Sequence, residues 1–318
     1  MVSKNLLPTL IDRFQGSALG TFVGDAMGRE VEGWPWELIR ARHGILKEIG
    51  EGLYTDDTEM MIGIMEGLRE DHGFDPALTA QRFLANFHPT RGYGPRLYGI
   101  MAKLRQGASW DEVGTDSWGN GGAMRIAPIG FFFYDDLKRL QKAALICTQI
   151  THRHPEGVAG ALAQAMGVGM ATQKGVNSEA IDQIAFLEEM VKGVEGIDRG
   201  VAQELGRITE MRQGADLEAK IELIAATFPR DVSAIGAVPA AIAAFLINAD
   251  FPDTVLTAVN CGGDTDTIGA MAGALAGAYY GFSAIPSAWL EPLENGEKGR
   301  DYVVSLAVEL ARIKEKEQ

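Results

Sequence analysis

The stretch Ile268-Gly-Ala-Met-Ala-Gly-Ala-Leu-Ala-Gly-Ala-Tyr-Tyr-Gly281 carries a glycine at every fourth position. In an α-helix this spacing aligns the glycines in one stripe, and a neighbouring helix can approach closely because no side chains intervene. Each interior glycine costs up to about 1 kcal/mol relative to alanine, so tight packing has to offset that loss. The stretch therefore predicts a central helix that is buried on all sides.

Helical spacing continues through most of the chain. One face of a segment that opens at Thr55-Asp56-Asp57-Thr58 carries Met60, Met61, Ile64, Met65 and Leu68. Asp75-Pro76 is typical of an N-cap followed by a first-turn proline. Further helices are expected over residues 95–105, 136–150, 156–172, 179–192, 200–212, 217–227, 234–248, 267–280 and 300–315. No stretch alternates apolar and polar residues in the way a strand does, so we predict an all-α fold in one domain, residues 1–318.

The composition is that of a globular protein. The 318 residues are 46% hydrophobic and 23% charged, which are average values for globular domains. A net charge of −14, spread along the chain, argues against a nucleic acid partner, because such partners require clustered cations. Cys147 and Cys261 form no CxxC pair, which fits a reducing compartment.

Two uncharged stretches, residues 232–249 and 267–290, are long enough to cross a membrane as helices. Both are rich in alanine and glycine, contain Pro239 or Pro286, and lack the flanking Lys and Arg that set an orientation. We therefore interpret them as buried helices. The N-terminal residues contain no secretory signal, so a cytoplasmic protein with no membrane partner is expected.

Two acidic clusters open predicted helices: Thr55-Asp56-Asp57-Thr58 and Gly262-Gly263-Asp264-Thr265-Asp266-Thr267. Helix capping explains one oxygen in each cluster, and carboxylates near a helix N-terminus are favourable in any case. If the two ends meet, however, like charges 4 Å apart repel by roughly 4 kcal/mol at an effective dielectric near 20. Carboxylates and hydroxyls suit Mg²⁺ or Mn²⁺ rather than zinc. The spacing alone is compatible with two interpretations, namely simple helix capping at each cluster or one metal site shared by both clusters.

Six motifs in the sequence resemble those of a known protein family. They are Gly24-Asp25-Ala26-Met27-Gly28 with Glu32, Tyr54-Thr-Asp-Asp-Thr-Glu-Met60, Arg91-Gly-Tyr-Gly94, Ser117-Trp-Gly-Asn-Gly-Gly-Ala-Met-Arg125, Thr151-His152 and Gly262-Gly-Asp-Thr-Asp-Thr267. In this order they resemble the ADP-ribosylglycohydrolases over about residues 14–290. The resemblance implies a compact orthogonal helical bundle with a dinuclear centre of two Mg²⁺ or Mn²⁺. It also implies hydrolysis of the bond between ADP-ribose and its acceptor, which is an ADP-ribosylated protein or a small ADP-ribose conjugate.

The resemblance also assigns individual residues. The implied metal ligands are Thr55, Asp56, Asp57, Asp264, Asp266 and Thr267. The implied catalytic residues are Glu32 and Asp57. Substrate contacts fall on Asp56, on His152, and on the glycine-rich loop Ser117, Trp118, Gly119, Asn120 and Gly121, which in the family wraps the diphosphate and the distal ribose.

Three neighbouring residues receive structural expectations. Asp25 is expected to hold the glycine-rich turn around it, and Arg125 to pair with a buried acid. Trp118 fits equally well a place in the core or a ring that faces the substrate. A zinc site at His152-x-His154 lacks a nearby third ligand.

The segments Gly119–Arg125 and Gly262–Gly281 look closest to the serine-directed branch of the family. An enzyme preferring O-linked conjugates, namely serine-ADP-ribose, O-acetyl-ADP-ribose or ADP-ribose chains, is therefore the leading hypothesis. An ADP-ribosylarginine hydrolase, a non-catalytic ADP-ribose-binding or structural protein, and a metal hydrolase of phosphate esters are the alternatives.

Overall fold

A computed structural model describes residues 6–211 and 216–317. Within these ranges the chain forms α-helices and short 3₁₀ helices and no β-strand, which confirms the all-α prediction. The first half contains α1 (Leu7–Gly28), η1 (Arg29–Val31), α2 (Trp36–His43), α3 (Asp56–Asp71), α4 (Pro76–Asn86), η2 (Pro89–Arg91), α5 (Pro95–Arg105), α6 (Trp110–Val113), η3 (Asn120–Gly122), α7 (Ala127–Phe132) and α8 (Leu137–Gln149). The second half contains α9 (Pro155–Asn177), α10 (Gln183–Val194), α11 (Arg199–Arg207), η4 (Ile208–Glu210), α12 (Leu217–Thr227), α13 (Ala234–Leu246), α14 (Phe251–Asn260), α15 (Thr265–Tyr280), η5 (Phe282–Ala284), α16 (Ser287–Leu290) and α17 (Arg300–Glu317).

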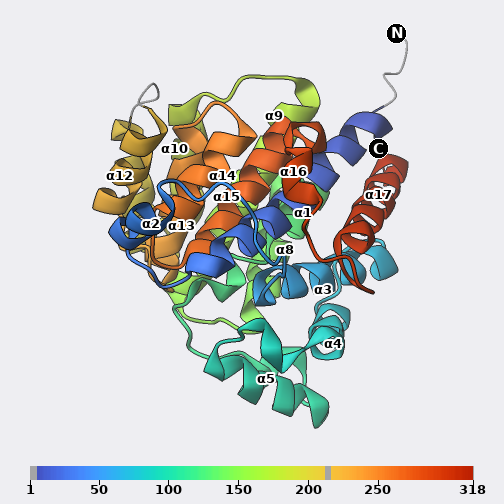
Figure 1. The fold of residues 1–318 in the computed structure, drawn as a ribbon. Coiled ribbons are helices and arrows are strands. Elements are labelled where there is room, and N and C mark those ends of the chain that lie inside the picture. Colours follow the sequence, from blue (N-terminus) through green and yellow to red (C-terminus); the bar gives the residue numbers. More distant parts are fainter. Residues whose placement is uncertain (1–5, 212–215, 318) are drawn as a thin grey trace.

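Helices α1 and α15 form the antiparallel pair at the centre of the molecule (Figure 1). Glycines of α1 meet glycines of α15 in register: Gly16 faces Gly277, Gly20 faces Gly273, and Gly24 faces Gly269. A Cβ built on Gly24 would lie 2.0 Å from the carbonyl oxygen of Gly269, so the two backbones are in direct contact. The predicted central helix is confirmed, with one correction. Gly281 also contacts α1, since its backbone carbon would lie 2.6 Å from a Cβ built on Gly16, but it ends α15 with φ 91° and is not inside the helix.

The partner helix α1 is absent from the expected set. Residues 24–28 look like a glycine-rich turn in the sequence, yet they are the last residues of a 22-residue helix. The glycines there serve close packing rather than a turn. A Cβ on Gly28 would lie 2.3 Å from the carbonyl oxygen of Thr265, which brings the end of α1 against the start of α15.

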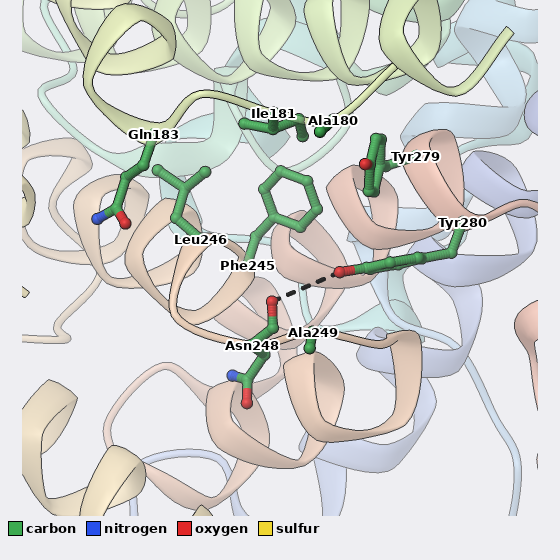
Figure 2. Close-up of a pocket in the computed structure, with 9 residues that line it drawn as sticks. All are labelled: Ala180, Ile181, Gln183, Phe245, Leu246, Asn248, Ala249, Tyr279 and Tyr280. Carbon is green, nitrogen blue, oxygen red and sulfur yellow. Dashed lines mark hydrogen bonds between the residues drawn. The ribbon is translucent and has the colours of Figure 1, made fainter. Parts of the chain in front are cut away.

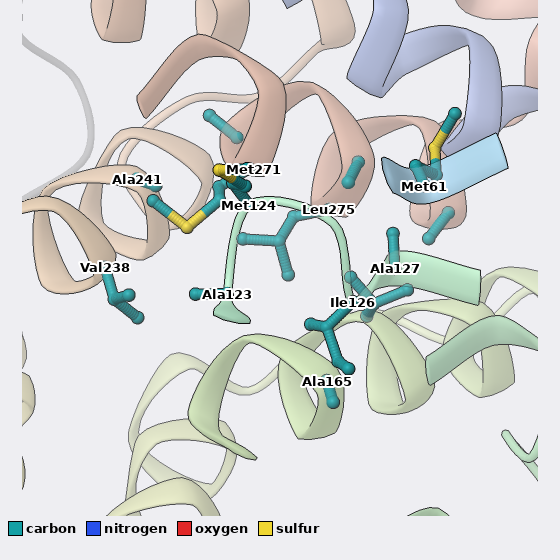
Figure 3. Packing of buried hydrophobic residues seen from close by; sticks show 14 of the residues in the cluster. Met61, Ala123, Met124, Ile126, Ala127, Ala165, Val238, Ala241, Met271 and Leu275 are labelled. Carbon is teal, nitrogen blue, oxygen red and sulfur yellow. The ribbon is translucent and has the colours of Figure 1, made fainter. Parts of the chain in front are cut away.

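Around this pair, small and flexible side chains fill the core (Figure 3). Met271 and Leu275 of α15 face Ala165 of α9 and Ala241 of α13, and all four are buried. Of the two stretches tested as membrane spans, the parts that form α13 and α15 belong to this interior, as expected. The second stretch extends past α15, however, and its Ser283, Ser287 and Ala288 are exposed. In the part of the chain that the structure describes, no helix has the length and apolar character needed to span a membrane.

Substituting Gly24 with alanine is expected to lower the free energy of unfolding by about 1–3 kcal/mol. The added methyl group overlaps a backbone carbonyl, and such overpacking outweighs the helix propensity gained. Gly99→Ala is the matched control, since Gly99 is an exposed α5 residue with no atom within 4 Å of its built Cβ. Chemical denaturation would measure both variants. A Gly24→Ala protein as stable as the control would contradict the direct backbone contact.

Candidate active site

The two acidic clusters meet at the N-termini of α3 and α15. The hydroxyls of Thr55 and Thr267 lie 3.1 and 3.4 Å from the same oxygen of Asp57, Oδ2. Segments distant in sequence therefore share one small volume, as the spacing hypothesis required. The close packing of α1 against α15 helps to place the second cluster beside the first.

Capping does not occupy these carboxylates. Thr55, not an aspartate, is the N-cap of α3, and its side chain accepts the backbone N–H of Asp57. Asp264 precedes α15 but makes no side-chain cap hydrogen bond. Its Oδ2 instead accepts the side-chain amide of Asn120 at 2.5 Å. Capping therefore does not account for these carboxylates, although Asp57, Asp264 and Asp266 each accept at least one hydrogen bond within the site.

Asp25 holds the first cluster in place. Its carboxylate accepts the backbone N–H groups of Thr55 and Thr58 at 3.0 and 3.1 Å, and the Thr58 hydroxyl at 2.6 Å. The expectation that Asp25 holds the glycine-rich segment around it was wrong, because that segment is helical. Burial raises the pKa of Asp25 to about 6, and these hydrogen bonds oppose the rise.

A second brace, which sequence reasoning missed, lies beside Tyr54. The Arg91 guanidinium stacks on the Tyr54 ring at 3.7 Å and donates to the Tyr54 carbonyl at 2.8 Å. It also forms a two-pronged ion pair with Glu294, at 2.6 and 3.1 Å. Glu294 in turn accepts the backbone N–H of Tyr54. The sequence signal was the presence of Tyr54 and Arg91 in two of the quoted motifs, and nothing in the sequence indicated Glu294.

Crowding makes the carboxylates costly to ionise together. Burial and then the Asp25 charge raise the pKa of Asp56 to about 8. Burial, with the neighbouring acids as the next cause, also raises the pKa of Asp57 and Asp266 well above the usual range. Without a bound cation, the ionised carboxylates of the site repel one another, and a positive charge among them would reduce that repulsion.

Glu32 joins the cluster from the loop after η1. One carboxylate oxygen from each of Glu32, Asp264 and Asp266 lies within 4.8 Å of the others, close enough to share one cation. Burial, followed by the Asp264 charge, raises the pKa of Glu32. The sequence singled out Glu32 for catalysis, and its place among the carboxylates was not foreseen.

These residues fit a hard divalent cation. The buried oxygen Asp57 Oδ1 has no hydrogen-bond partner, an unfavourable state that a cation ligand would remedy. The donors are carboxylate and hydroxyl oxygens, the set that Mg²⁺ and Mn²⁺ prefer. The site can therefore hold such an ion without rearranging the fold.

The glycine-rich loop forms the opposite wall. Asn120 N–H donates to the Val232 carbonyl, and Ala234 N–H donates to the Trp118 carbonyl. A Cβ on Gly121 would lie 2.8 Å from the His152 ring, so a glycine there lets the loop rest on the imidazole. The loop runs directly into the three-residue η3, which begins at Asn120, and the next α-helix, α7, begins at Ala127.

The expectations for Trp118, Arg125 and His152 have different outcomes. Trp118 faces the cavity, with 44% of its surface exposed. Within residues 6–211 and 216–317, Arg125 forms no ion pair with an acid. Its guanidinium lies over the Phe83 ring and donates to Thr151 and to the Cys147 carbonyl. Burial, with Arg125 and Arg96 next, lowers the pKa of His152 to about 3, which keeps the imidazole neutral.

One cavity of about 410 Å³ contains every predicted site residue. Its lining includes Glu32, Thr55, Asp56, Asp57, Ser117, Trp118, Gly119, Asn120, Gly121, His152, Asp264, Asp266 and Thr267. A second cavity, of about 160 Å³, is lined by Phe245, Tyr279, Tyr280 and their neighbours and by none of those residues (Figure 2). The larger cavity is the candidate active site.

Comparison with known proteins identifies the family. The family model described as ADP-ribosylglycohydrolase matches residues 6–318. The chain belongs to the ADP-ribosylglycohydrolase family. It is 31% identical to the ADP-ribosylhydrolase ARH3 of Gallus gallus over 332 residues, with 89% of each chain covered. The corresponding identity to ARH3 of Homo sapiens is 30% over 337 residues, with 91% of each chain covered.

A solved structure titled "ADP-ribosylglycohydrolase-related protein complex" superposes with a TM-score of 0.75 at 28% identity. It covers 97% of this chain and 100% of the matched chain. Family membership makes the protein an enzyme of the glycosidase type and accounts for an oxygen-rich site suited to a metal ion.

Proposed function

We propose that the protein is a metal-dependent hydrolase that cleaves the glycosidic bond between ADP-ribose and its acceptor, with a preference for O-linked acceptors. The observation that carries this proposal is the single cavity in which both acidic clusters face the Ser117–Gly121 loop. An elongated substrate with a ribose at one end and a diphosphate beside it matches that division into acidic and glycine-rich walls. Residues 1–318 would act as one domain.

The six ligands proposed for two Mg²⁺ or Mn²⁺ are Thr55, Asp56, Asp57, Asp264, Asp266 and Thr267. Bound ions of this kind supply charge that orients ribose hydroxyls and activates water. Asn120 keeps the Asp264 carboxylate in place, and Asp25 keeps the Thr55–Thr58 turn in place. Asp56, the loop residues and neutral His152 would contact the substrate.

Glu32 and Asp57 are the proposed catalytic residues. Glu32 stands on a loop at the edge of the acidic cluster, with its carboxylate exposed to the cavity. From there it can give a proton to the leaving oxygen as the glycosidic bond breaks. Asp57 is buried deeper, and its unpartnered Oδ1 is available to a ligand.

The preference for O-linked acceptors has a chemical basis. An alkoxide is a poor leaving group and needs that proton, whereas a guanidinium departs as neutral guanidine. Similarity of the Gly-Asn-Gly-Gly-Ala-Met-Arg and Gly-Gly-Asp-Thr-Asp-Thr segments to the serine-directed branch supports the same preference.

A product assay tests the function. Purified protein would be incubated with serine-linked, arginine-linked and O-acetyl ADP-ribose in Mg²⁺ or Mn²⁺, and released ADP-ribose would be quantified. We expect faster release from the two O-linked substrates. Release from the arginine linkage alone would overturn the acceptor preference, and release of inorganic phosphate instead of ADP-ribose would overturn the reaction.

Removing divalent cations is expected to lower the melting temperature. A ligand that binds only the folded state stabilises it by RT ln(1 + [L]/Kd), about 2.7 kcal/mol at a hundredfold excess over Kd. Thermal unfolding would be followed with chelator and again with 5–10 mM Mg²⁺, roughly such an excess for a mid-micromolar site. Identical melting temperatures in the two conditions would contradict metal binding to the folded protein.

A further inference from the structure

We infer that Arg96, at the start of α5, binds the diphosphate of the substrate from a position beside the start of the Ser117–Gly121 loop. The inference rests on the proposed function and assigns a role to a residue outside all six motifs. Arg96 lines the candidate active site together with its neighbours Gly94, Pro95 and Leu97.

The glycine-rich loop offers fewer donors than its composition suggests. Of its five backbone N–H groups, that of Ser117 donates to the Thr115 carbonyl at 2.8 Å, and that of Gly119 to the Ser117 hydroxyl at 3.4 Å. The N–H of Asn120 donates to the Val232 carbonyl at 3.0 Å. Three of the five are thus engaged within the protein, so a diphosphate needs donors from elsewhere.

The charge around the cavity points the same way. Five carboxylates line it, those of Glu32, Asp56, Asp57, Asp264 and Asp266. His152 is neutral, for the reason given above. Among the described residues, the cations of the lining are Arg96 and Arg125, and Arg125 is fully buried with its donors facing Thr151 and Cys147. Arg96 is the exposed one.

Arg96 is also held in a suitable position. Its Nη1 donates to the backbone carbonyl of Asp116 at 2.9 Å, which fixes the guanidinium beside the first residue of the glycine-rich loop. Among the described residues no other hydrogen bond or ion pair engages this guanidinium, so its remaining nitrogens can bind an anion. Arg96 lies in the first turn of the 11-residue α5, where the helix dipole also favours negative charge. In Figure 1, α5 lies at the lower edge of the molecule.

The physical role follows from the protein's net charge. A dianionic diphosphate carries the same sign of charge as this chain of net charge −14, so its binding needs a cationic group near it. A guanidinium can bind two phosphate oxygens at once, which gives both charge and orientation. Arg96 would therefore set the affinity for ADP-ribose and contribute little to the bond cleavage itself.

Binding of ADP-ribose to three variants, measured by titration calorimetry, tests this role. Arg96→Gln is expected to weaken binding by about 10- to 100-fold, the range that loss of a charge-assisted hydrogen-bond pair produces. Arg96→Lys keeps the charge but loses the two-pronged geometry, so its affinity should lie between those of the wild type and Arg96→Gln. Arg105→Gln, which removes an exposed arginine at the other end of α5, should bind like the wild type.

Two further readouts separate this role from others. Arg96→Gln should raise KM with little change in kcat, and its ADP-ribose affinity should depend less on salt than that of the wild type. Unchanged affinity in Arg96→Gln would overturn the inference. An Arg96→Lys variant as weak as Arg96→Gln would also overturn it, since the positive charge would then contribute nothing to binding. Failure of the wild type to bind ADP-ribose would instead refute the proposed function.

Discussion

Replacing Asp266 with asparagine is expected to lower turnover of an O-linked ADP-ribose conjugate by at least about a thousandfold, equivalent to roughly 4 kcal/mol in the activation barrier. The substitution removes one carboxylate from the three whose oxygens lie within 4.8 Å of one another. A metal ion that loses an anionic ligand binds more weakly and stabilises less transition-state charge. Initial rates at saturating Mg²⁺ would measure the loss.

The folded protein should survive this substitution. Asp266 lies near Asp57, Asp264 and Glu32, whose charges all disfavour its ionised form. Removing one charge therefore relieves repulsion, and the metal-free variant should melt at or above the wild-type temperature. Asp116→Asn, at an exposed position next to the glycine-rich loop, is the matched control and should retain full activity. A near-wild-type rate for Asp266→Asn would show that the proposed ligand is wrong.

Replacing Glu32 with glutamine is expected to slow cleavage of the serine-linked substrate by at least a hundredfold, within the range of about 10² to 10⁴ for general acid–base catalysis. The amide keeps the size of the side chain but cannot give up a proton to the leaving oxygen. Affinity for ADP-ribose should change far less, because the proton is needed only as the bond breaks. Steady-state kinetics at saturating Mg²⁺, combined with ADP-ribose titration, would measure both effects.

Glu37→Gln supplies the comparison, since Glu37 is an exposed glutamate five residues further along the chain. It should leave kcat unchanged. The position of Glu32 beside Asp264 and Asp266 raises a second possible role, as a metal ligand, which predicts a variant rescued by higher Mg²⁺. Rescue of Glu32→Gln by metal, or equal rates for the two variants, would contradict the general-acid role.

The helices that sequence periodicity predicted well are those whose ends carry local signals. Helix α4 begins where Asp75 caps the backbone N–H of Leu78 and Pro76 occupies the first turn. The expected bounds of α5 and α12 agree with the structure. Capping and breaker residues act within a few positions of the chain, so their effect is readable without tertiary contacts.

Helix α1 was missed because its decisive interactions are distant in sequence. Its Gly24 and Gly28 read locally as a turn, and only contact with Gly269 and Thr265 of α15 explains them. The wrong pairing expected for Arg125 has a similar origin. Nothing local indicates that Phe83 and Thr151 would surround the guanidinium in place of an acid.

The site could be predicted further than the fold around it, since the proposed metal ligands fall in two short motifs. The two acidic clusters do lie together, and the carboxylate and hydroxyl residues that they contribute could be identified in the sequence. The motifs could not predict how the side chains and backbone N–H groups that line the cavity are oriented. The engaged N–H groups of the glycine-rich loop, the carboxylate of Glu32 beside Asp264, and the position of Arg96 are all consequences of packing.

The most direct test of metal-dependent hydrolysis is the rate of ADP-ribose release from a serine-linked conjugate by a single chelator-treated preparation as Mg²⁺ or Mn²⁺ is returned. Turnover should be negligible in the chelator and should rise to a plateau with added metal, and Asp266→Asn should remain inactive across the same titration. Undiminished turnover in the chelator, with the conjugate fully converted, would contradict the role assigned to the acidic cluster.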